Sequence, residues 1–370
     1  MKTRALVWGN GKSAYTVADY VRTELSASMD CVGFYISDCK KINKDVNELV
    51  YTMNEVVSDN NEIADVLIIP NPGKKISDIL FEHRTIKNKR ILFVSAENIR
   101  RPNKSNYFFE ISGNKPWLNG FEYHVVDHCN LNCKGCGHCA NLFNAPSFGD
   151  IDVYERDLKR LSELFEGVGL IRLLGGEPLL NGDLKRYIEI TRTYFKLAEI
   201  HIVTNGILIP SMGKDFLRFL NERGVIVDIS VYPPVEKRLS TIINTLKLSD
   251  IEFNVMPVEQ FYKRFSLTGK FDKCEAFYNC GTATCHTLFD GKIAPCIVPF
   301  STEKLNREFN INIPIDGWID LFENEIDGDT INERLKQPFE LCSHCNPQKS
   351  FFAWEQRRFE DCKLEDWTCD

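Results

Sequence analysis

The chain has 370 residues, of which 43% are hydrophobic, so it is long enough for two or three domains with substantial cores. Its 45 basic and 52 acidic residues give a formal net charge of −7, which excludes the basic surface of a protein whose main partner is nucleic acid. No apolar run approaches the roughly 18 residues of a membrane span, and MKTRALVWGN lacks the layout of a signal peptide, so a cytoplasmic protein is expected.

Residues 1–105 alternate short apolar runs with helical patterns, which indicates an α/β domain with a parallel sheet. The strands are expected at RALVWG, CVGFYISD, DVLIIP and RILFVS, because each run is short, apolar and rich in β-branched or aromatic residues. Helices are expected over Ser13–Leu25 and Ile76–Ile86.

The turn after the first strand has the layout of a Rossmann-like, dinucleotide-binding domain. Gly9 and Gly11 form a G-x-G-x-x-A turn between strand and helix, and Asp38 closes the next strand. Such glycines let a phosphate approach the helix N-terminus, and the acid binds a ribose. The same turn occurs in domains that bind nothing, so nucleotide binding by this domain stays open.

Residues 106–265 repeat the alternation more clearly, after a connector rich in turn formers over 100–120. Strands are expected at FEYHVVDH, LIRLLGG, EIHIVTNG, VIVDISVYP and IEFNVMPV, with a helix over Tyr154–Phe165. Parallel strands with crossover helices form an open sheet or a barrel. In either case the active site belongs at the carboxyl ends of the strands, where the motifs of this segment lie.

The first of these motifs is HCNLNCKGCGHC, with Cys129, Cys133 and Cys136 spaced C-x3-C-x2-C directly after a strand. The chain has 14 cysteines, and in a reducing compartment clustered cysteines indicate metal rather than disulfides. Three thiolates can bind three irons of a [4Fe–4S] cluster and leave the fourth open for catalysis. The alternative is a zinc knuckle with Cys139 or His138 as fourth ligand.

The second motif is Gly175, Gly176, Glu177 and Pro178 at the end of the next strand. Two residues without side chains allow the backbone to approach a ligand closely, and a carboxylate can pair with a ligand ammonium. A plain strand-to-helix turn could have the same sequence. The motif therefore indicates a ligand site only in combination with the cysteine triplet upstream.

Together, Cys129-N-L-N-Cys133-K-G-Cys136, the GGEP turn and the strand IVTNG resemble the radical S-adenosylmethionine (SAM) superfamily. The resemblance implies a partial (β/α)6 barrel and a [4Fe–4S] cluster that binds SAM and cleaves it reductively to a 5′-deoxyadenosyl radical. It also implies that Gly175–Glu177 receive the methionyl amine. The weaker candidates for SAM contacts are Thr204, Asn205 and Ser230. One departure is Gly135, where this superfamily often has an aromatic residue, so adenine packing is expected to differ.

Residues 266–370 lose the regular rhythm and hold eight cysteines, so metal is expected to contribute to their stability. The pair Cys342 and Cys345, with two distant thiolates, makes a four-ligand set for zinc or for a fully ligated iron–sulfur cluster. The pattern C…DGK…PC…CxxC resembles the twitch domain, a shortened relative of the SPASM domain. It implies an auxiliary [4Fe–4S] cluster held by Cys285, Cys296, Cys342 and Cys345, with Cys280 as the alternative to Cys285.

The order of the three segments resembles radical SAM proteins associated with bacterial surface-polysaccharide biosynthesis. The expected substrate is therefore a carbohydrate or a nucleotide-linked sugar, and the expected electron donor is of flavodoxin or ferredoxin type. Two outcomes stay open: dehydrogenation, with the auxiliary cluster accepting an electron, and epimerisation, with Cys139 returning a hydrogen. The alternatives are a peptide-modifying radical SAM maturase and, in another class, a non-catalytic binding module stabilised by zinc.

Overall fold

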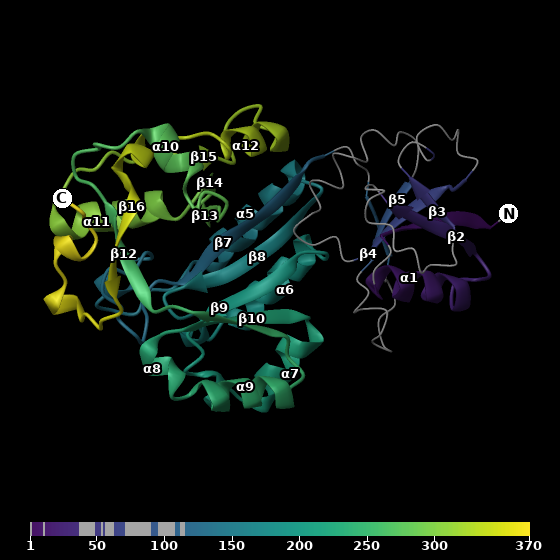
Figure 1. Ribbon diagram of the computed structural model, residues 1–370, viewed down its shortest axis with the longest axis horizontal. Helices are drawn as coiled ribbons and strands as arrows, with labels where there is room; N and C mark the ends of the chain where they lie inside the picture. The colour runs from purple at the N-terminus through teal and green to yellow at the C-terminus, as the bar shows by residue number, and fades with distance from the viewer. Residues whose placement is uncertain are drawn as a thin grey trace. The chain divides into compact units, whose positions relative to one another are not determined.

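The computed structural model describes residues 2–9, 12–36, 49–52, 55, 63–70, 90–94, 108–111 and 115–370. The chain forms two compact units (Figure 1). Unit 1 consists of Met1–Asn119 and Phe165–Gly169, and unit 2 consists of Gly120–Leu164 and Leu170–Asp370. Within the described residues, no helix has the combination of length and apolar character that crossing a membrane requires.

Unit 1 is built on a six-stranded sheet in the order β3-β2-β1-β4-β5-β6. Its strands are β1 (Thr3–Trp8), β2 (Met29–Ile36), β3 (Val50–Thr52), β4 (Val66–Pro70), β5 (Arg90–Val94) and β6 (Phe108–Ile111). Neighbouring strands are parallel except β5 and β6, which are antiparallel. Helix α1 (Lys12–Thr23) joins the sheet's buried core through Ala14, Val17, Ala18 and Val21. This strand order is that of doubly wound nucleotide-binding sheets.

The four strands and the first helix predicted for this unit are confirmed, with ends that shift by a few residues. The predicted connector was partly wrong, because Phe108–Ile111 forms β6 and pairs with β5. Gly9 has a φ of 89°, a backbone conformation that glycine adopts without strain. The helix predicted over Ile76–Ile86 lies outside the described residues, as do Gly11 and Asp38.

Unit 2 contains an eight-stranded sheet in the order β11-β10-β9-β8-β7-β13-β14-β15. Its five predicted strands are confirmed as β7 (Trp117–Val126), β8 (Gly167–Gly175), β9 (Glu199–Thr204), β10 (Val225–Val231) and β11 (Phe253–Pro257). The pairs β8–β9, β9–β10 and β10–β11 are parallel. The sheet continues on the other side of β7 with β13 (Thr287–Phe289), β14 (Lys292–Ala294) and β15 (Ile319–Asp320).

Helices connect the successive strands of this sheet, as parallel pairing requires. They are α5 (Ile151–Leu164), α6 (Leu184–Tyr194), α7 (Lys214–Glu222), α8 (Pro233–Glu236) and α9 (Leu239–Leu248). The predicted helix over Tyr154–Phe165 corresponds to α5. The C-terminal part adds α10 (Lys273–Tyr278), α11 (Val298–Phe309), α12 (Gly328–Arg334) and the short 3₁₀ turn η6 (Glu340–His344). Two further 3₁₀ turns, η3 (Ala140–Leu142) and η4 (Pro178–Leu180), follow β7 and β8.

Strand β12 (Gln260–Phe265) does not extend the large sheet, because it pairs antiparallel with β16 (Cys345–Ala353). A six-stranded barrel is therefore not visible as one hydrogen-bonded sheet and stays a prediction. The predicted segments 106–265 and 266–370 both contribute to unit 2, since β13 pairs with β7.

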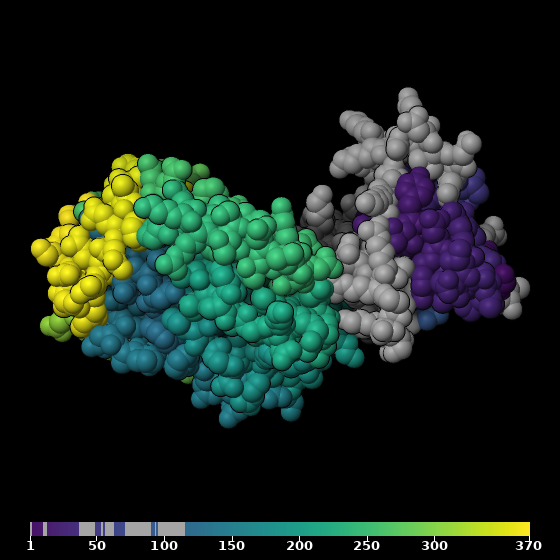
Figure 2. Space-filling view, turned by 90° about the horizontal axis from the view of Figure 1, so that it is seen from below, coloured from purple at the N-terminus to yellow at the C-terminus, as the bar shows by residue number. Residues whose placement is uncertain are grey.

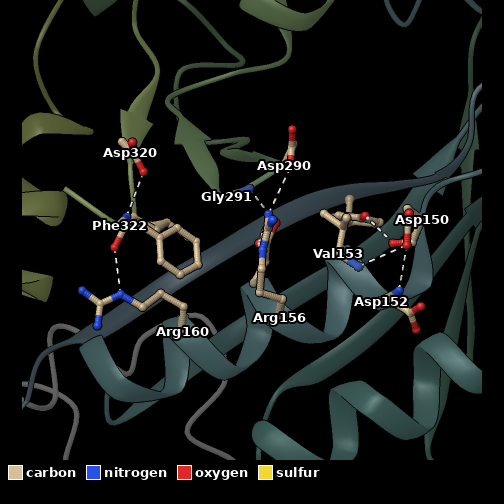
Figure 3. Close-up of polar contacts among 12 residues, drawn as sticks. Asp150, Asp152, Val153, Arg156, Arg160, Asp290, Gly291, Asp320 and Phe322 are labelled. Carbon is tan, nitrogen blue, oxygen red and sulfur yellow. Dashed lines mark hydrogen bonds and ion pairs between the residues drawn. The ribbon is translucent and has the colours of Figure 1, made fainter.

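Helix α5 holds the C-terminal part against the sheet through two arginines (Figure 3). Arg156 bonds both Asp157 and Asp290, while the main-chain N–H of Gly291 donates to the second Asp157 oxygen at 2.7 Å. Arg160 donates to the Leu321 carbonyl at 2.8 Å. These contacts attach the β13–β14 turn and the end of β15 to the outer face of α5.

The C-terminal residues also share a buried core with the cysteine segment that follows β7. This cluster contains Cys139, Leu142, Phe265, Cys296, Val298, Leu305, Ile313, Leu341 and Trp367. Figure 2 shows the C-terminal residues, in yellow, lying against the blue surface of the chain that follows residue 115. The carboxyl end of β7 is therefore covered by chain that is more than two hundred residues away in sequence.

Candidate active site

The loop after β7 carries Cys129, Cys133 and Cys136 in a tight turn. Asn132 and Gly135 have φ angles of 51° and 61°, and the Cys136 N–H donates to the Cys133 carbonyl at 3.3 Å. Left-handed residues of this kind reverse the chain within a few positions. The structure thus brings the three predicted thiols into one loop at the carboxyl end of a strand.

Burial is the largest influence on the three thiols. The pKa of Cys129 is raised to about 12, mainly by burial and in part by the neighbouring Glu177 and Cys136. Burial also raises the pKa of Cys133 and Cys136, and the charge of Cys136 adds to the shift at Cys133. Buried thiols with raised pKa values become thiolates when a cation binds them, so this donor set fits an iron–sulfur cluster.

Gly175 and Gly176 allow the end of β8 to pass against the end of β7. A Cβ on Gly175 would collide with the Val126 carbonyl, and one on Gly176 with the His128 carbonyl. The Gly176 N–H donates to Val126 at 2.8 Å, and the Glu177 N–H donates to His128 at 3.1 Å. The sequence predicted that these glycines allow the backbone to approach a ligand. In the structure they allow it to approach the backbone of Val126 and His128, next to Cys129.

The side chain of Glu177 is fully buried and bonded within the protein. Its carboxylate accepts hydrogen bonds from Thr204 Oγ1 at 2.6 Å, from the Asn205 N–H at 2.9 Å and from the Leu179 N–H at 3.0 Å. Burial raises its pKa to about 7, although these bonds oppose the rise. That this carboxylate also pairs with a ligand ammonium stays a prediction, because three bonds leave part of its acceptor capacity unused. Pro178 follows as the first residue of η4.

Asn205 extends this linkage to the cysteine loop. Its Nδ2 donates to Asn130 Oδ1 at 2.7 Å and lies 3.9 Å from Cys129 Sγ. Thr204 and Asn205 therefore join the ends of β8 and β9 to the loop. Ser230, on β10, hydrogen-bonds Tyr232, whose pKa is raised by burial and by the charges of the three thiols.

Three aromatic residues that the sequence motifs did not single out contact this loop. Trp354 Nε1 donates to Cys133 Sγ at 3.1 Å, and Trp367 Nε1 donates to the Cys136 carbonyl at 2.9 Å. A Cβ on Gly135 would lie 2.7 Å from Cζ of Phe352. An aromatic ring from β16 thus fills the space beside the position where the superfamily often has an aromatic residue of its own. No motif marks these residues, because they are distant in sequence.

Cys139 and His138 lie on the far side of the loop from Glu177's network. Cys139 is buried in the core cluster, with its Sγ 3.8 Å from the Ser301 carbonyl, and burial raises its pKa. His138 contacts His124 at 2.8 Å, and burial lowers its pKa to about 3. That His138 or Cys139 is the fourth ligand of a zinc ion remains a prediction. The role of Cys139 as a hydrogen donor remains one as well.

A cavity of about 360 Å³ opens beside Cys129. It is lined by the cysteine loop, by the segment from Asn141 to Pro146 and by Arg358, Phe359 and Glu360. The cysteine loop therefore borders an open space as well as the end of the sheet.

The second set of cysteines gathers in the C-terminal part of unit 2. The charges that act on the Cys345 thiol include those of Cys296, Cys342 and Cys280, and burial raises its pKa well above the usual value. The charge of Cys280 also raises the pKa of Cys296 and of Cys342, in addition to the larger effect of burial. Cys280 therefore lies near enough to the three other predicted ligands for its charge to act on them.

Cys285 has different neighbours, and the choice between Cys285 and Cys280 as the fourth ligand stays a prediction. Its neighbours are Glu122 and Arg172, which hydrogen-bond it. The cause is the pairing of β13 with β7, in which the Glu122 N–H donates to His286 at 2.6 Å and so draws the preceding residue to this place.

Within the described part of the chain, no three histidine, cysteine, aspartate or glutamate side chains are arranged around one metal ion. Around a single zinc, thiolate sulfurs stand only about 4 Å apart, given Zn–S bonds of about 2.3 Å. In a [4Fe–4S] cluster each cysteine binds a different iron, so the thiols stand wider apart.

Residues 123–243 match the family model described as the Radical SAM superfamily. Similar proteins include the GTP 3′,8-cyclases of Clostridium acetobutylicum, 33% identical over 99 residues, and of Helicobacter pylori, 36% identical over 93 residues. Each match covers 25% of this chain, and the chain spans 28% of the length of each of these curated relatives.

Two solved structures similar to this chain are complexes with AdoMet. BtrN in complex with AdoMet and 2-DOIA is 19% identical over 63% of this chain and 94% of its own, with a TM-score of 0.43. Native anSMEcpe with bound AdoMet is 20% identical over 39% of this chain and 45% of its own, with a TM-score of 0.33.

Proposed function

The chain carries a radical SAM superfamily domain, and on this premise we propose that it is an enzyme that cleaves SAM reductively and abstracts a hydrogen atom from a carbohydrate or nucleotide-linked sugar. The observation that carries the proposal is the seating of Cys129, Cys133 and Cys136 in one loop against the GGEP turn. When bound, the cluster supplies one electron to SAM, which yields methionine and a 5′-deoxyadenosyl radical.

The residues of this chain hold and orient the reactants. Cys129, Cys133 and Cys136 bind three irons and leave the fourth for the methionyl group of SAM. The turn Gly175–Glu177 receives the methionyl amine, and Thr204 and Asn205 hold the Glu177 carboxylate in place. Trp354 and Asn205 fix the orientation of the cysteine loop.

The C-terminal part is proposed to be a twitch-type domain with an auxiliary [4Fe–4S] cluster. Its ligands are Cys280, Cys296, Cys342 and Cys345, with Cys280 in the place first assigned to Cys285. Their mutual electrostatic influence supports this set. Zinc is the alternative occupant, and a tetrahedral zinc site would require the four thiols to close in around one ion.

A sugar substrate is supported by a row of polar side chains across the strands of the large sheet. Glu122 pairs with Arg172 at 3.1 Å, and Asp228 bonds both His201 and Asn254 at 2.7 Å. These residues come from β7, β8, β9, β10 and β11, five neighbours in the sheet. Alternating donors and acceptors of this kind suit the hydroxyl groups of a carbohydrate.

The cellular setting is proposed from the chemistry. The thirteen cysteines of the described residues are free thiols, which suits a reducing cytoplasm and a flavodoxin- or ferredoxin-type electron donor. A role in surface-polysaccharide biosynthesis follows from the order of the segments. We also propose that unit 1 binds a nucleotide through Gly9, Gly11 and Asp38. The hydrogen abstraction leads either to dehydrogenation or to epimerisation of the substrate.

The test is 5′-deoxyadenosine formation by anaerobically reconstituted, reduced protein with SAM and a panel of nucleotide-sugars. GTP joins the panel because the name of the similar cyclases contains it. The C129A/C133A/C136A variant is expected to form none, while C274A, which removes an exposed cysteine, is expected to keep the activity. Acceleration by one sugar supports the proposal, and turnover that no sugar changes favours a maturase. Absence of 5′-deoxyadenosine from protein shown to contain its cluster would contradict radical chemistry.

A further inference from the structure

Arg264 lies between the two cysteine sites of unit 2, and no motif marks it. It is part of β12, at an irregularity of the pairing with β16 between Lys263 and Phe265. The residue opposite Phe265 in this ladder is Cys345. The backbone therefore fixes Arg264 next to one of the four auxiliary cysteines.

A hydrogen-bonded threonine connects Arg264 to a second cysteine of this set. Its Nη1 donates to Thr282 Oγ1 at 3.3 Å, and the same oxygen lies 3.2 Å from Cys280 Sγ. The Tyr262 ring supports the guanidinium from one side, with 4.9 Å between the Arg264 carbon Cζ and the ring centroid. The guanidinium is thus oriented toward the thiols by neighbours on β12 and on the following loop.

The same side chain reaches the other cysteine loop. A Cβ on Gly137 would lie 3.8 Å from Arg264 Nη2, and Gly137 follows Cys136 directly. Helix α11 contacts the same residue from its own side, because Ser301 Oγ donates to the Gly137 carbonyl at 2.6 Å. This helix begins two residues after Cys296, so both sites share their supports.

The charged and polar neighbours of Arg264 are a tyrosine and thiols, which become thiolates only when they bind a cation. Among the residues that the structure describes, no carboxylate forms an ion pair with its guanidinium. Burial lowers the pKa of Arg264, but Tyr262 and the thiols of Cys345, Cys296 and Cys280 raise it by more. A partly buried cation needs negative charge nearby, and a set of four thiolates provides it.

We propose that Arg264 is a positioning residue that raises the reduction potential of the auxiliary cluster held by Cys280, Cys296, Cys342 and Cys345, an inference that rests on the proposed function. Adding an electron makes a thiolate-bound cluster more negative, so a fixed cation beside it stabilises the reduced form more than the oxidised form. Arginine suits this role because its guanidinium stays protonated at all working pH values.

The test is an EPR-monitored redox titration in the C129A/C133A/C136A background, where any [4Fe–4S] signal comes from the auxiliary site. R264Q is expected to shift the midpoint potential to a more negative value, and R264K by less, because lysine keeps the charge but loses the bond to Thr282. K263Q removes the positive charge next to Arg264 in β12 and is the matched control. It is expected to leave the potential nearly unchanged.

The outcomes separate the two proposals. If the triple variant holds no [4Fe–4S] cluster, the auxiliary site of the proposed function is wrong. If it holds the cluster and R264Q titrates with the parent potential, the inference about Arg264 is wrong. If R264Q does not retain the cluster, T282V takes its place, because it removes the hydroxyl that orients Arg264 toward Cys280. T282V is then expected to give a smaller negative shift, and an unchanged potential would overturn the inference.

Discussion

The two cysteine sites of unit 2 differ in how they are assembled. Cys129, Cys133 and Cys136 lie in one short loop, which two left-handed residues close. The second set extends from Cys280 to Cys345 and comes together only through the packing of the C-terminal part. A site within one loop is recognisable from spacing alone, whereas an assembled site requires the fold to identify its members.

The supports of the two sites differ as well. The first loop is seated on the ends of β7, β8 and β9 through backbone contacts of Gly176 and Glu177 and through Asn205. The second depends on loops, on the start of α11 and on the β12–β16 pair that carries Arg264. Changes at the strand ends should therefore damage the first site, and changes in the later loops should remove the second.

The largest effect is expected from G175A. An added Cβ would collide with the Val126 carbonyl, and the φ of 137° at this position is unfavourable for other residues. Unit 2 should lose more than about 4 kcal/mol of unfolding free energy, together with iron binding at the first loop. G182A is the matched control, because nothing lies within 4 Å of its added Cβ. Chemical denaturation and iron analysis measure both, and equal stability of the two variants would show that the seating of the loop is misassigned.

The next largest effect is a difference in iron content between C280A and C285A, whose cysteines are five positions apart. C280A is expected to lose the auxiliary cluster, about four iron atoms per chain, while C285A keeps it. The reason is that Cys280 acts on Cys345, whereas Cys285 contacts Glu122 and Arg172. Iron content and the EPR signal of the reconstituted proteins show which of the two variants retains the auxiliary cluster. Loss of iron in C285A alone would restore the first assignment.

A smaller effect concerns the pH dependence of stability. Glu177 has a pKa raised from 4.5 to about 7 by burial, so the folded state binds more protons than the unfolded state between these values. The free energy of unfolding should fall by about 3 kcal/mol as the pH rises through this range. E177Q should remove this dependence, and E252Q, at an exposed carboxylate, should retain it. Urea denaturation across the range provides the measurement, and an unchanged slope in E177Q would show that Glu177 is ionised throughout.

Local patterns of the sequence predicted much of the fold. Apolar patterns identified β1, β2, β4 and β5 of one sheet, β7 to β11 of the other, and helices α1 and α5, because these patterns depend on near neighbours. They missed β3, β6 and β13 to β15. The cysteine triplet and the GGEP turn were equally local, and the structure brings them together at the ends of β7 and β8. The sequence by itself therefore determined the α/β class and the place of the three-cysteine loop at the end of β7.

Tertiary structure decided what depends on residues far apart in the chain. The pairing of β13 with β7 brings Cys285 to Glu122 and Arg172, which is why we propose Cys280 in its place. The end of β9 engages Glu177, which spacing had suggested for a ligand, and β16 brings Phe352 to Gly135. The position of Arg264 beside both cysteine sites is likewise visible only in the fold, because the two sites are far apart in sequence. Such contacts follow from the burial and hydrogen bonding of the whole unit, which no short pattern contains.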